Sequence, residues 1–207
     1  MASTYHNLGN VYLVLHDYEQ SLRYFQQAIT IREVLFGKTH IDIAGGYYSI
    51  ARVHIYEEKY DRAIEYLDHA LATLDTQQYM RHPLMHLIFR QKSSAQMKLG
   101  HYDEAEALLQ QSSQMVQAQY GQDHPDMIQA HLSLGLLHEE KGDMMAAMRQ
   151  YEEAHAMSLR SQGDRRNETA VALLNMASVY RKLGKKAQAV ASFERALGIL
   201  EARGTER

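Results

Sequence analysis

The sequence repeats itself every 42 residues, and this period constrains the fold more than any other feature. Small side chains recur at one position in five copies, at Ala28, Ala70, Ser112, Ala154 and Ala196. Apolar and aromatic residues recur in step with them, and the copies follow one another without insertion or deletion. A fixed period of roughly 20–50 residues is typical of stacked repeats, in which each unit is supported by its neighbours.

Each 42-residue unit divides into two amphipathic segments, which predicts an all-α fold of about ten antiparallel helices. In the first unit, Tyr5, Leu8 and Tyr12 have the spacing of one helical stripe, and a second stripe follows a short turn. Gly9 and Ala28 are small enough to let the two helices of the unit pack closely. The expected helices cover residues 2–15, 18–36, 41–58, 61–77, 83–99, 102–119, 125–141, 144–161, 166–183 and 186–203.

Part of the repeat resembles a known family. The stretch Ala28–Gly37 (AITIREVLFG), followed by His40, Asp42 and Ala44, is similar to the helix end and linker of the tetratricopeptide repeat. The 42-residue form resembles the repeats of kinesin light chains and related bacterial proteins, and Tyr120–Asp126 (YGQDHPD) repeats the linker part. The resemblance implies a right-handed α-solenoid of five helix-turn-helix repeats. Its first helices would line a concave groove for peptides or partner helices.

The predicted domain organisation is a single array over residues 1–207. Its repeats are expected at residues 2–40, 41–82, 83–124, 125–166 and 167–203.

Composition argues against several other classes of protein. The 207 residues include no cysteine, which excludes thiol nucleophiles, disulfides and zinc–thiolate sites and fits a cytoplasmic setting. A formal net charge of −3 gives no reason to expect nucleic-acid binding. No apolar run approaches the roughly 20 residues of a membrane span. Phosphate-binding loops, Ser–His–Asp arrangements and HExxH motifs do not occur either. We therefore expect no enzyme, no cofactor and no membrane or nucleic-acid partner.

One histidine pair leaves a metal-dependent enzyme as the weakest alternative. His82 and His86 are four residues apart, so a helix would place both imidazoles on one face. No carboxylate or third histidine is near them in the sequence. His82 also recurs as a repeat position, with His40 and His124. We therefore expect no metal site.

Helix geometry places a candidate ligand surface beside the packing stripe of the first helices. Its positions carry mainly amide, hydroxyl and guanidinium groups: His6, Asn7, Asn10, Tyr48, Ser49, Arg52, Arg90, Gln91, Ser94, Ser133, Asn175, Ser178 and Arg181. Such groups can hold a peptide backbone, and arginine can hold a carboxylate through two hydrogen bonds. We hypothesise a peptide or partner helix with an acidic residue near Arg52 and Arg90. The alternative is that these are ordinary solvated side chains.

The ends of the array leave two functions open. Val190, Phe193, Leu197 and Leu200 would lack a following repeat to pack against. The favoured explanation is that the chain is a segment of a longer protein; the other is self-association through uncapped terminal helices. The chain is accordingly expected to be a protein–protein interaction module. The alternative is a sensor, scaffold or oligomerisation segment of a larger bacterial-type regulator.

Overall fold

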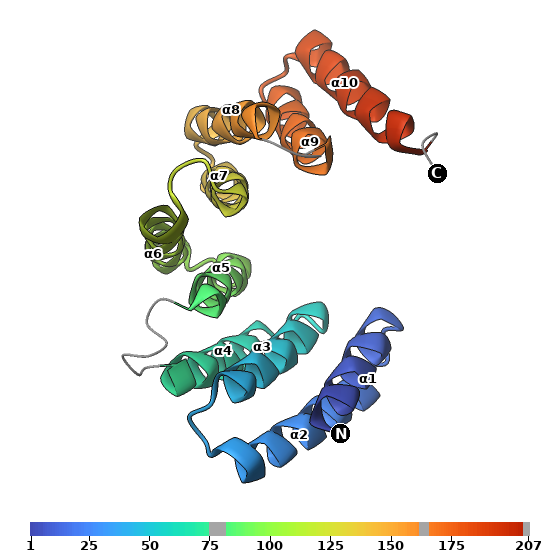
Figure 1. Cartoon of the computed structure of the whole chain (residues 1–207). Coiled ribbons are helices and arrows are strands. Elements are labelled where there is room, and N and C mark those ends of the chain that lie inside the picture. The colour runs from blue at the N-terminus through green and yellow to red at the C-terminus, as the bar shows by residue number, and fades with distance from the viewer. Residues whose placement is uncertain (75–81, 162–165, 205–207) are drawn as a thin grey trace. The chain divides into compact units, whose positions relative to one another are not determined.

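The computed structural model describes residues 1–74, 82–161 and 166–204, which form ten α-helices and no strand (Figure 1). The helices are α1 (Ala2–Val14), α2 (Tyr18–Phe36), α3 (Ile41–Tyr56), α4 (Tyr60–Leu74), α5 (Pro83–Lys98), α6 (Tyr102–Tyr120), α7 (Pro125–Glu140), α8 (Met144–Arg160), α9 (Arg166–Lys182) and α10 (Lys186–Gly204). The predicted helix ends are confirmed to within two residues wherever the structure describes them. Residues 75–77, predicted as the end of a helix, lie outside the described residues. None of the helices in the described ranges is long and apolar enough to span a bilayer.

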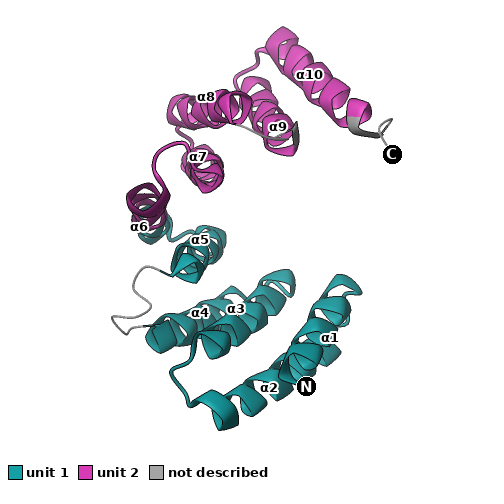
Figure 2. Ribbon diagram, viewed as in Figure 1, with its two compact units in different colours: residues 1–108 teal, residues 109–207 magenta. Residues whose placement is uncertain are grey.

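The chain divides into two compact units, Met1–Leu108 and Leu109–Arg207, and the boundary falls within α6 (Figure 2). In unit 1, each helix from α1 to α4 packs against the next helix along the chain. In unit 2, the helices from α7 to α10 pack in the same order. The all-α architecture of paired helices is therefore confirmed within each unit. That the five repeats form one continuous array stays a prediction.

The turn between the two helices of a repeat has the same backbone structure in all five copies. Its central residue has a positive φ of 59° to 83° at His16, Glu58, Gly100, Gly142 and Gly184. The next residue donates its N–H to the carbonyl five residues earlier, over 2.8 to 2.9 Å, in every copy. This combination is the Schellman helix end, for which glycine is the favoured residue. The helix predicted to reach residue 58 ends earlier because Glu58 takes this left-handed conformation.

A histidine caps the first helix of three repeats. The Nδ1 atoms of His40, His82 and His124 accept hydrogen bonds from the backbone N–H two residues later, over 3.1 to 3.2 Å. The rings of His40 and His124 stack on Phe36 and Tyr120, with centroids 4.4 and 4.3 Å apart. The recurring histidine therefore satisfies a free N–H at a helix start, in the way that polar N-cap residues do.

Packing within a repeat depends on one small residue that faces one large residue. A Cβ atom added to Gly9 would lie 2.6 Å from the ring of Phe25, and one added to Gly135 would lie 2.3 Å from Tyr151. In the second repeat, Ala51 holds the position of Gly9 and packs in one cluster with Leu67, which is smaller than Phe25. Both side chains are fully buried. The steric role predicted for the small residues is confirmed, because a glycine occurs where the facing side chain is an aromatic ring that approaches this closely.

Hydrophobic clusters join successive repeats within each unit. One cluster in unit 1 contains side chains of the first and second repeats, namely Leu13, Phe25, Ile29, Ile43, Ile50 and Val53. In unit 2, Tyr151 belongs to a cluster that also contains Met176 and Val179 of the following repeat. Since such clusters draw on two repeats, each repeat depends on its neighbour for burial of its apolar side chains.

Candidate functional site

The first helices of successive repeats contact one another within each unit. In unit 1, α3 contacts both α1 and α5, and in unit 2, α7 contacts α9. Residues at one repeat position therefore follow one another across these helices. We use the term first-helix surface for the candidate residues of unit 1: His6, Asn7, Asn10, Tyr48, Ser49, Arg52, Arg90, Gln91 and Ser94. The candidate residues of unit 2 are Ser133, Asn175, Ser178 and Arg181.

Two arginines supply the positive charge of the first-helix surface. Arg52 on α3 and Arg90 on α5 are both half-buried. Within the ranges that the structure describes, neither guanidinium group forms a hydrogen bond or an ion pair. Asn10 and Gln91, which are also half-buried, add amide donors and acceptors to the same face. This arrangement leaves two guanidinium groups able to bind an acidic ligand.

Two other candidate side chains are directed into the protein. The hydroxyl of Ser49, which is 4% exposed, donates a hydrogen bond to the carbonyl of Gly45 over 2.9 Å. The ring of His6 lies 5.2 Å from that of Phe25, and its Nδ1 atom is buried. Burial, followed by the charges of Arg32 and Arg52, lowers the pKa of His6. His6 is therefore neutral at pH 7, and the arginines carry the charge of this surface.

In unit 2, one carboxylate joins three helices. Glu139 of α7 is 7% exposed and accepts hydrogen bonds from the hydroxyls of Tyr151 and Ser178, each over 2.9 Å. Lys182 of α9 forms an ion pair with the same carboxylate at 2.9 Å. Burial favours a higher pKa for Glu139, but the hydrogen bonds from Lys182, Tyr151 and Ser178 outweigh it and lower the pKa. Glu139 is therefore ionised at neutral pH and neutralises Lys182.

The sequence pattern predicts that Ser178 lies on the ligand surface, but it does not identify Glu139 as the partner of Ser178. A signal was present, because Glu139 occupies the repeat position of Leu13, which is buried and apolar. Tyr151 likewise occupies the position of Phe25. Two polar replacements at neighbouring positions in one repeat indicate a buried polar pair, since an isolated buried polar group would be unfavourable.

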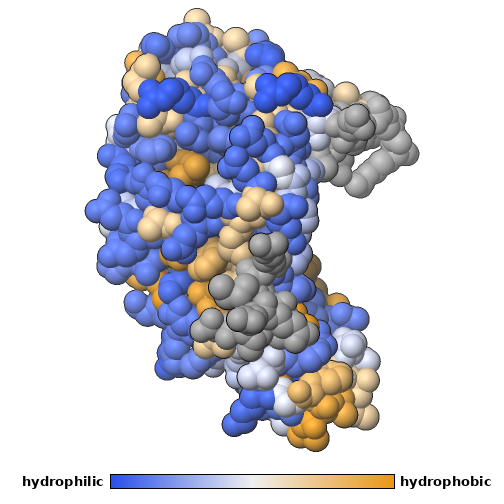
Figure 3. Space-filling view, turned by 60° about the vertical axis from the view of Figure 1, so that its left-hand side comes forward, coloured by the Kyte–Doolittle hydropathy of each residue, from blue (hydrophilic) through white to orange (hydrophobic). Residues whose placement is uncertain are grey.

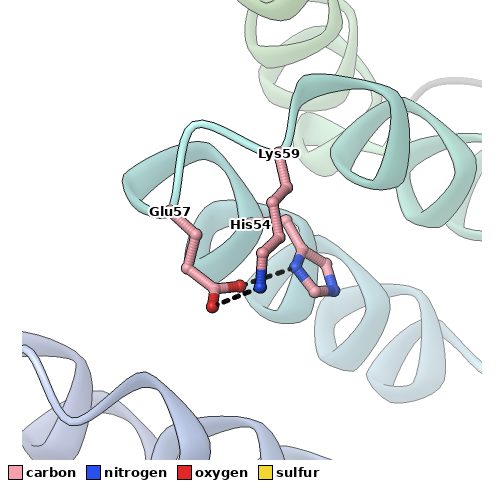
Figure 4. A network of polar contacts seen from close by, with 3 residues as sticks. All are labelled: His54, Glu57 and Lys59. Carbon is pink, nitrogen blue, oxygen red and sulfur yellow. Dashed lines mark hydrogen bonds and ion pairs between the residues drawn. The ribbon is translucent and has the colours of Figure 1, made fainter.

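A second polar network closes the turn after α3 (Figure 4). His54, Glu57 and Lys59 point toward one another, with Glu57 at 3.0 Å from the imidazole and 2.7 Å from the ammonium group. Burial opposes ionisation of Glu57, but hydrogen bonds from Lys59 and His54 lower its pKa overall. The imidazole ring also stacks on Tyr66 at 5.4 Å. The network holds the start of α4 against the end of α3.

Of the pair His82 and His86, one histidine caps a helix and the other is buried. The Nδ1 atom of His82 is occupied as the cap of α5, and His86 is 4% exposed. Among the residues described, no three histidine, cysteine, aspartate or glutamate side chains gather as a metal ion would need.

Unit 2 also contains a surface cavity of about 440 Å³, lined by Asp123, Pro125, Met157, Arg160 and Ser161. It lies where the linker before α7 meets the end of α8, and none of the candidate ligand residues lines it. The acidic Asp123 opposes the basic Arg160, so the lining has no clear preference for one sign of charge.

An apolar group of side chains is exposed where α2 ends. Val34, Leu35 and Phe36 are 83%, 63% and 52% exposed. Figure 3 shows a mostly hydrophilic face with hydrophobic side chains gathered at its lowest part, the height at which α2 ends in Figure 1. Apolar groups of this kind often mark contact surfaces, and this one lies outside the first-helix surface.

Comparison with known families identifies the repeat. A family model described as tetratricopeptide repeat matches residues 1–76, 85–160 and 129–202. The chain belongs to the tetratricopeptide repeat family. The resemblance seen in the linker sequences is thereby confirmed for the greater part of the chain. No curated protein sequence matches the chain.

Solved structures show the same tetratricopeptide repeat fold. BtubC (BKLC) from P. vanneervenii is similar with a TM-score of 0.82 and 19% identity, over 95% of this chain and 78% of that chain. A protein assigned as a kinesin light chain in Podosopora anserina, with nearly identical TPR-like repeats, gives a TM-score of 0.75 and 18% identity, over 97% of this chain and 95% of that chain. A Rap protein in complex with Competence and Sporulation Factor gives 0.79 and 15%, over 94% of this chain and 52% of that chain. These identities support a shared fold and no more.

Proposed function

We propose that this tetratricopeptide repeat protein is a protein–protein interaction module that binds an acidic peptide or partner helix on the first-helix surface of unit 1. The observation that carries the proposal is the pair Arg52 and Arg90. Both are half-buried, lie on neighbouring first helices, and have no carboxylate partner among the described residues. The proposal gives the chain no chemistry of its own and places it in the cytoplasm.

Unit 1 is favoured over unit 2 because of the charges in each unit. In unit 2, Lys182 is neutralised by Glu139, and Ser178 donates its hydroxyl to the same carboxylate. In unit 1, the guanidinium groups are free to form paired hydrogen bonds with a carboxylate. An exposed ion pair contributes only about 0–1 kcal/mol, so partial burial of the arginines matters to the affinity.

A second candidate function is a sensor or scaffold segment of a larger regulator. The Rap protein favours it, because the part that this chain resembles is about half of that protein, which was solved in complex with Competence and Sporulation Factor. In this case binding at the repeats would act on a further part of the protein.

A displayed-peptide selection tests the first proposal with three forms of the chain: the wild type, Arg52→Glu/Arg90→Glu and Arg23→Glu/Arg62→Glu. The last is a matched control, because Arg23 and Arg62 are exposed on second helices of unit 1 and the same change of charge is made there. Other repeats already carry glutamate at these positions, at Glu65 and Glu104.

The wild type and the matched control should enrich peptides with aspartate or glutamate, and the Arg52→Glu/Arg90→Glu form should not. Equal enrichment on all three forms would place the acid-binding site elsewhere. No enrichment on any of them would favour the sensor or scaffold function.

A further inference from the structure

Helix α10 has an apolar face that nothing in the described structure covers. Val190, Phe193, Leu197 and Leu200 are 55%, 41%, 54% and 42% exposed, and we call them the tail face. Among the described elements, α10 packs against α9 (Figure 1), and its Arg195 reaches His155 of α8 over 3.3 Å. Four large apolar side chains on one helical face are unusual on a free surface and are typical of a contact surface.

The repeat positions show what covers such a face. The tail-face residues correspond to residues of α2 four repeats earlier in the chain, namely Leu22, Phe25, Ile29 and Arg32. There Phe25 and Ile29 are fully buried, because the second repeat packs on them through α3. The phenylalanine is the same in both helices. The tail face therefore has the same repeat positions as the face of α2 on which α3, the first helix of the next repeat, packs.

The first repeat carries the complementary surface. The hydrophobic cluster that contains Phe25 also contains three residues of the second repeat, namely Val53, Tyr47 and Tyr66. The corresponding residues of the first repeat are identical: Val11, Tyr5 and Tyr24, which we call the head face. Val53 is fully buried, whereas Val11 is 53% exposed.

The head face is already ordered as a packing surface. The ring of Tyr24 stacks on Tyr5 at 6.0 Å and on Tyr12 at 5.3 Å, with interplanar angles of 22° and 15°. Because these rings are held by one another, little side-chain freedom would be lost when a partner packs on them.

We propose that the tail face of one copy of this chain packs against the head face of a second copy, in the manner in which α2 packs against the second repeat. The two surfaces reproduce an interface already present within unit 1, with identical residues at the phenylalanine, the valine and two tyrosines. This identity is the reason for a second copy as the partner.

One difference between the two interfaces is compatible with the proposal. Gly46, which Ile29 approaches closely, corresponds to Thr4 of the first repeat, next to Tyr5 of the head face. The fully buried Ile88 holds the same position in α5, in a cluster with Leu71, which is the counterpart of Leu197. An interface with leucine at the position of Leu197 can therefore accommodate a branched side chain at the position of Thr4.

A head-to-tail contact of this kind uses different surfaces on the two copies. Each added copy leaves one head face and one tail face free, so association can continue unless the assembly closes on itself. The average mass in solution should rise with concentration above the monomer mass of 23.8 kDa.

The test measures mass by light scattering coupled to size exclusion, from low micromolar to submillimolar concentration. The head variant is Val11→Glu and the tail variant is Leu197→Glu; both residues are more than half exposed, so each variant should fold. Met145→Glu is the matched control, because Met145 is 63% exposed and α2 has a glutamate at the same position, Glu19. Unchanged helical spectra and melting temperatures are required of all three.

The wild type and Met145→Glu should associate, and the head and tail variants should each be monomers. An equimolar mixture of the two variants should give a dimer of twice the monomer mass and nothing larger, because only one intact head and one intact tail can meet. A wild type that stays monomeric throughout would overturn the proposal. So would a head variant that dimerises alone, since that would indicate pairing of two tail faces.

Discussion

The buried carboxylate of Glu139 gives the sharpest prediction about stability, because another repeat already contains its apolar replacement. In the first repeat the same two positions hold Leu13 and Phe25, which pack in one cluster and are 5% and 0% exposed. The double variant Glu139→Leu/Tyr151→Phe therefore transfers a pair that this protein already packs.

The single variants should each be less stable than the wild type. Glu139→Leu leaves the fully buried phenol of Tyr151 without its acceptor, which costs about 1–3 kcal/mol. Tyr151→Phe removes a hydrogen bond to a charged group, which contributes about 1.5–3 kcal/mol. The double variant lacks the Glu139 partner of Ser178 and Lys182, as Glu139→Leu does, but it leaves no buried phenol unpaired. It should therefore lose at least about 1 kcal/mol less than the sum of the two single losses.

The assay is chemical denaturation of the four proteins, followed by circular dichroism. Glu139→Leu combined with Leu159→Ala serves as the control, because Leu159 is 65% exposed and takes no part in the contact, so these losses should add. If the Glu139 and Tyr151 losses also add, the hydrogen bond between them does not stabilise unit 2, and the reasoning is refuted.

Three further predictions concern acid stability, strain and packing. The pKa of Glu139 is lowered from its usual value of 4.5, so its stabilising contribution is present above that pH and is lost as the pH falls through the lowered pKa. The Glu139→Gln variant should therefore lose less stability than the wild type in acid titrations followed by circular dichroism, and equal losses would contradict the pKa shift. Glu58→Gly should raise the melting temperature, because glycine removes a left-handed strain of about 1–2 kcal/mol at a φ of 59°; a lower melting temperature would contradict this. Gly135→Ala should lower it, because the new Cβ would lie 2.3 Å from Tyr151 and overpacking costs about 1–3 kcal/mol, whereas Gly45→Ala, with nothing within 4 Å, should not.

The fold could be predicted from the sequence because its determinants are local and repeated. The period fixes the number of helices, and the glycine or polar residue at each turn fixes where they end. Glu58 shows the limit of this reasoning, since nothing in its side chain indicates a left-handed backbone. Its conformation follows from the turn that the other repeats form with Gly100, Gly142 and Gly184.

The candidate site could be predicted only in outline. Helical periodicity predicts which residues share the face with Arg52, but it does not predict their hydrogen bonds. Ser49 bonds to its own helix, and Ser178 bonds to a carboxylate on another helix. The contacts of Glu139 depend on three helices meeting at one point, which a pattern along one helix does not describe.

A binding titration most directly tests the central claim, that Arg52 and Arg90 form an acid-binding surface in unit 1. A labelled acidic peptide from the selection is titrated with the wild type, with Arg52→Glu/Arg90→Glu and with Arg23→Glu/Arg62→Glu, by fluorescence anisotropy at low and high salt. We expect the first variant to weaken binding by about tenfold or more, equivalent to about 1.4 kcal/mol, and to reduce its dependence on salt. The matched control should bind as the wild type does. Equal weakening by both variants would show that net charge alone attracts the peptide, and would contradict a specific site at Arg52 and Arg90.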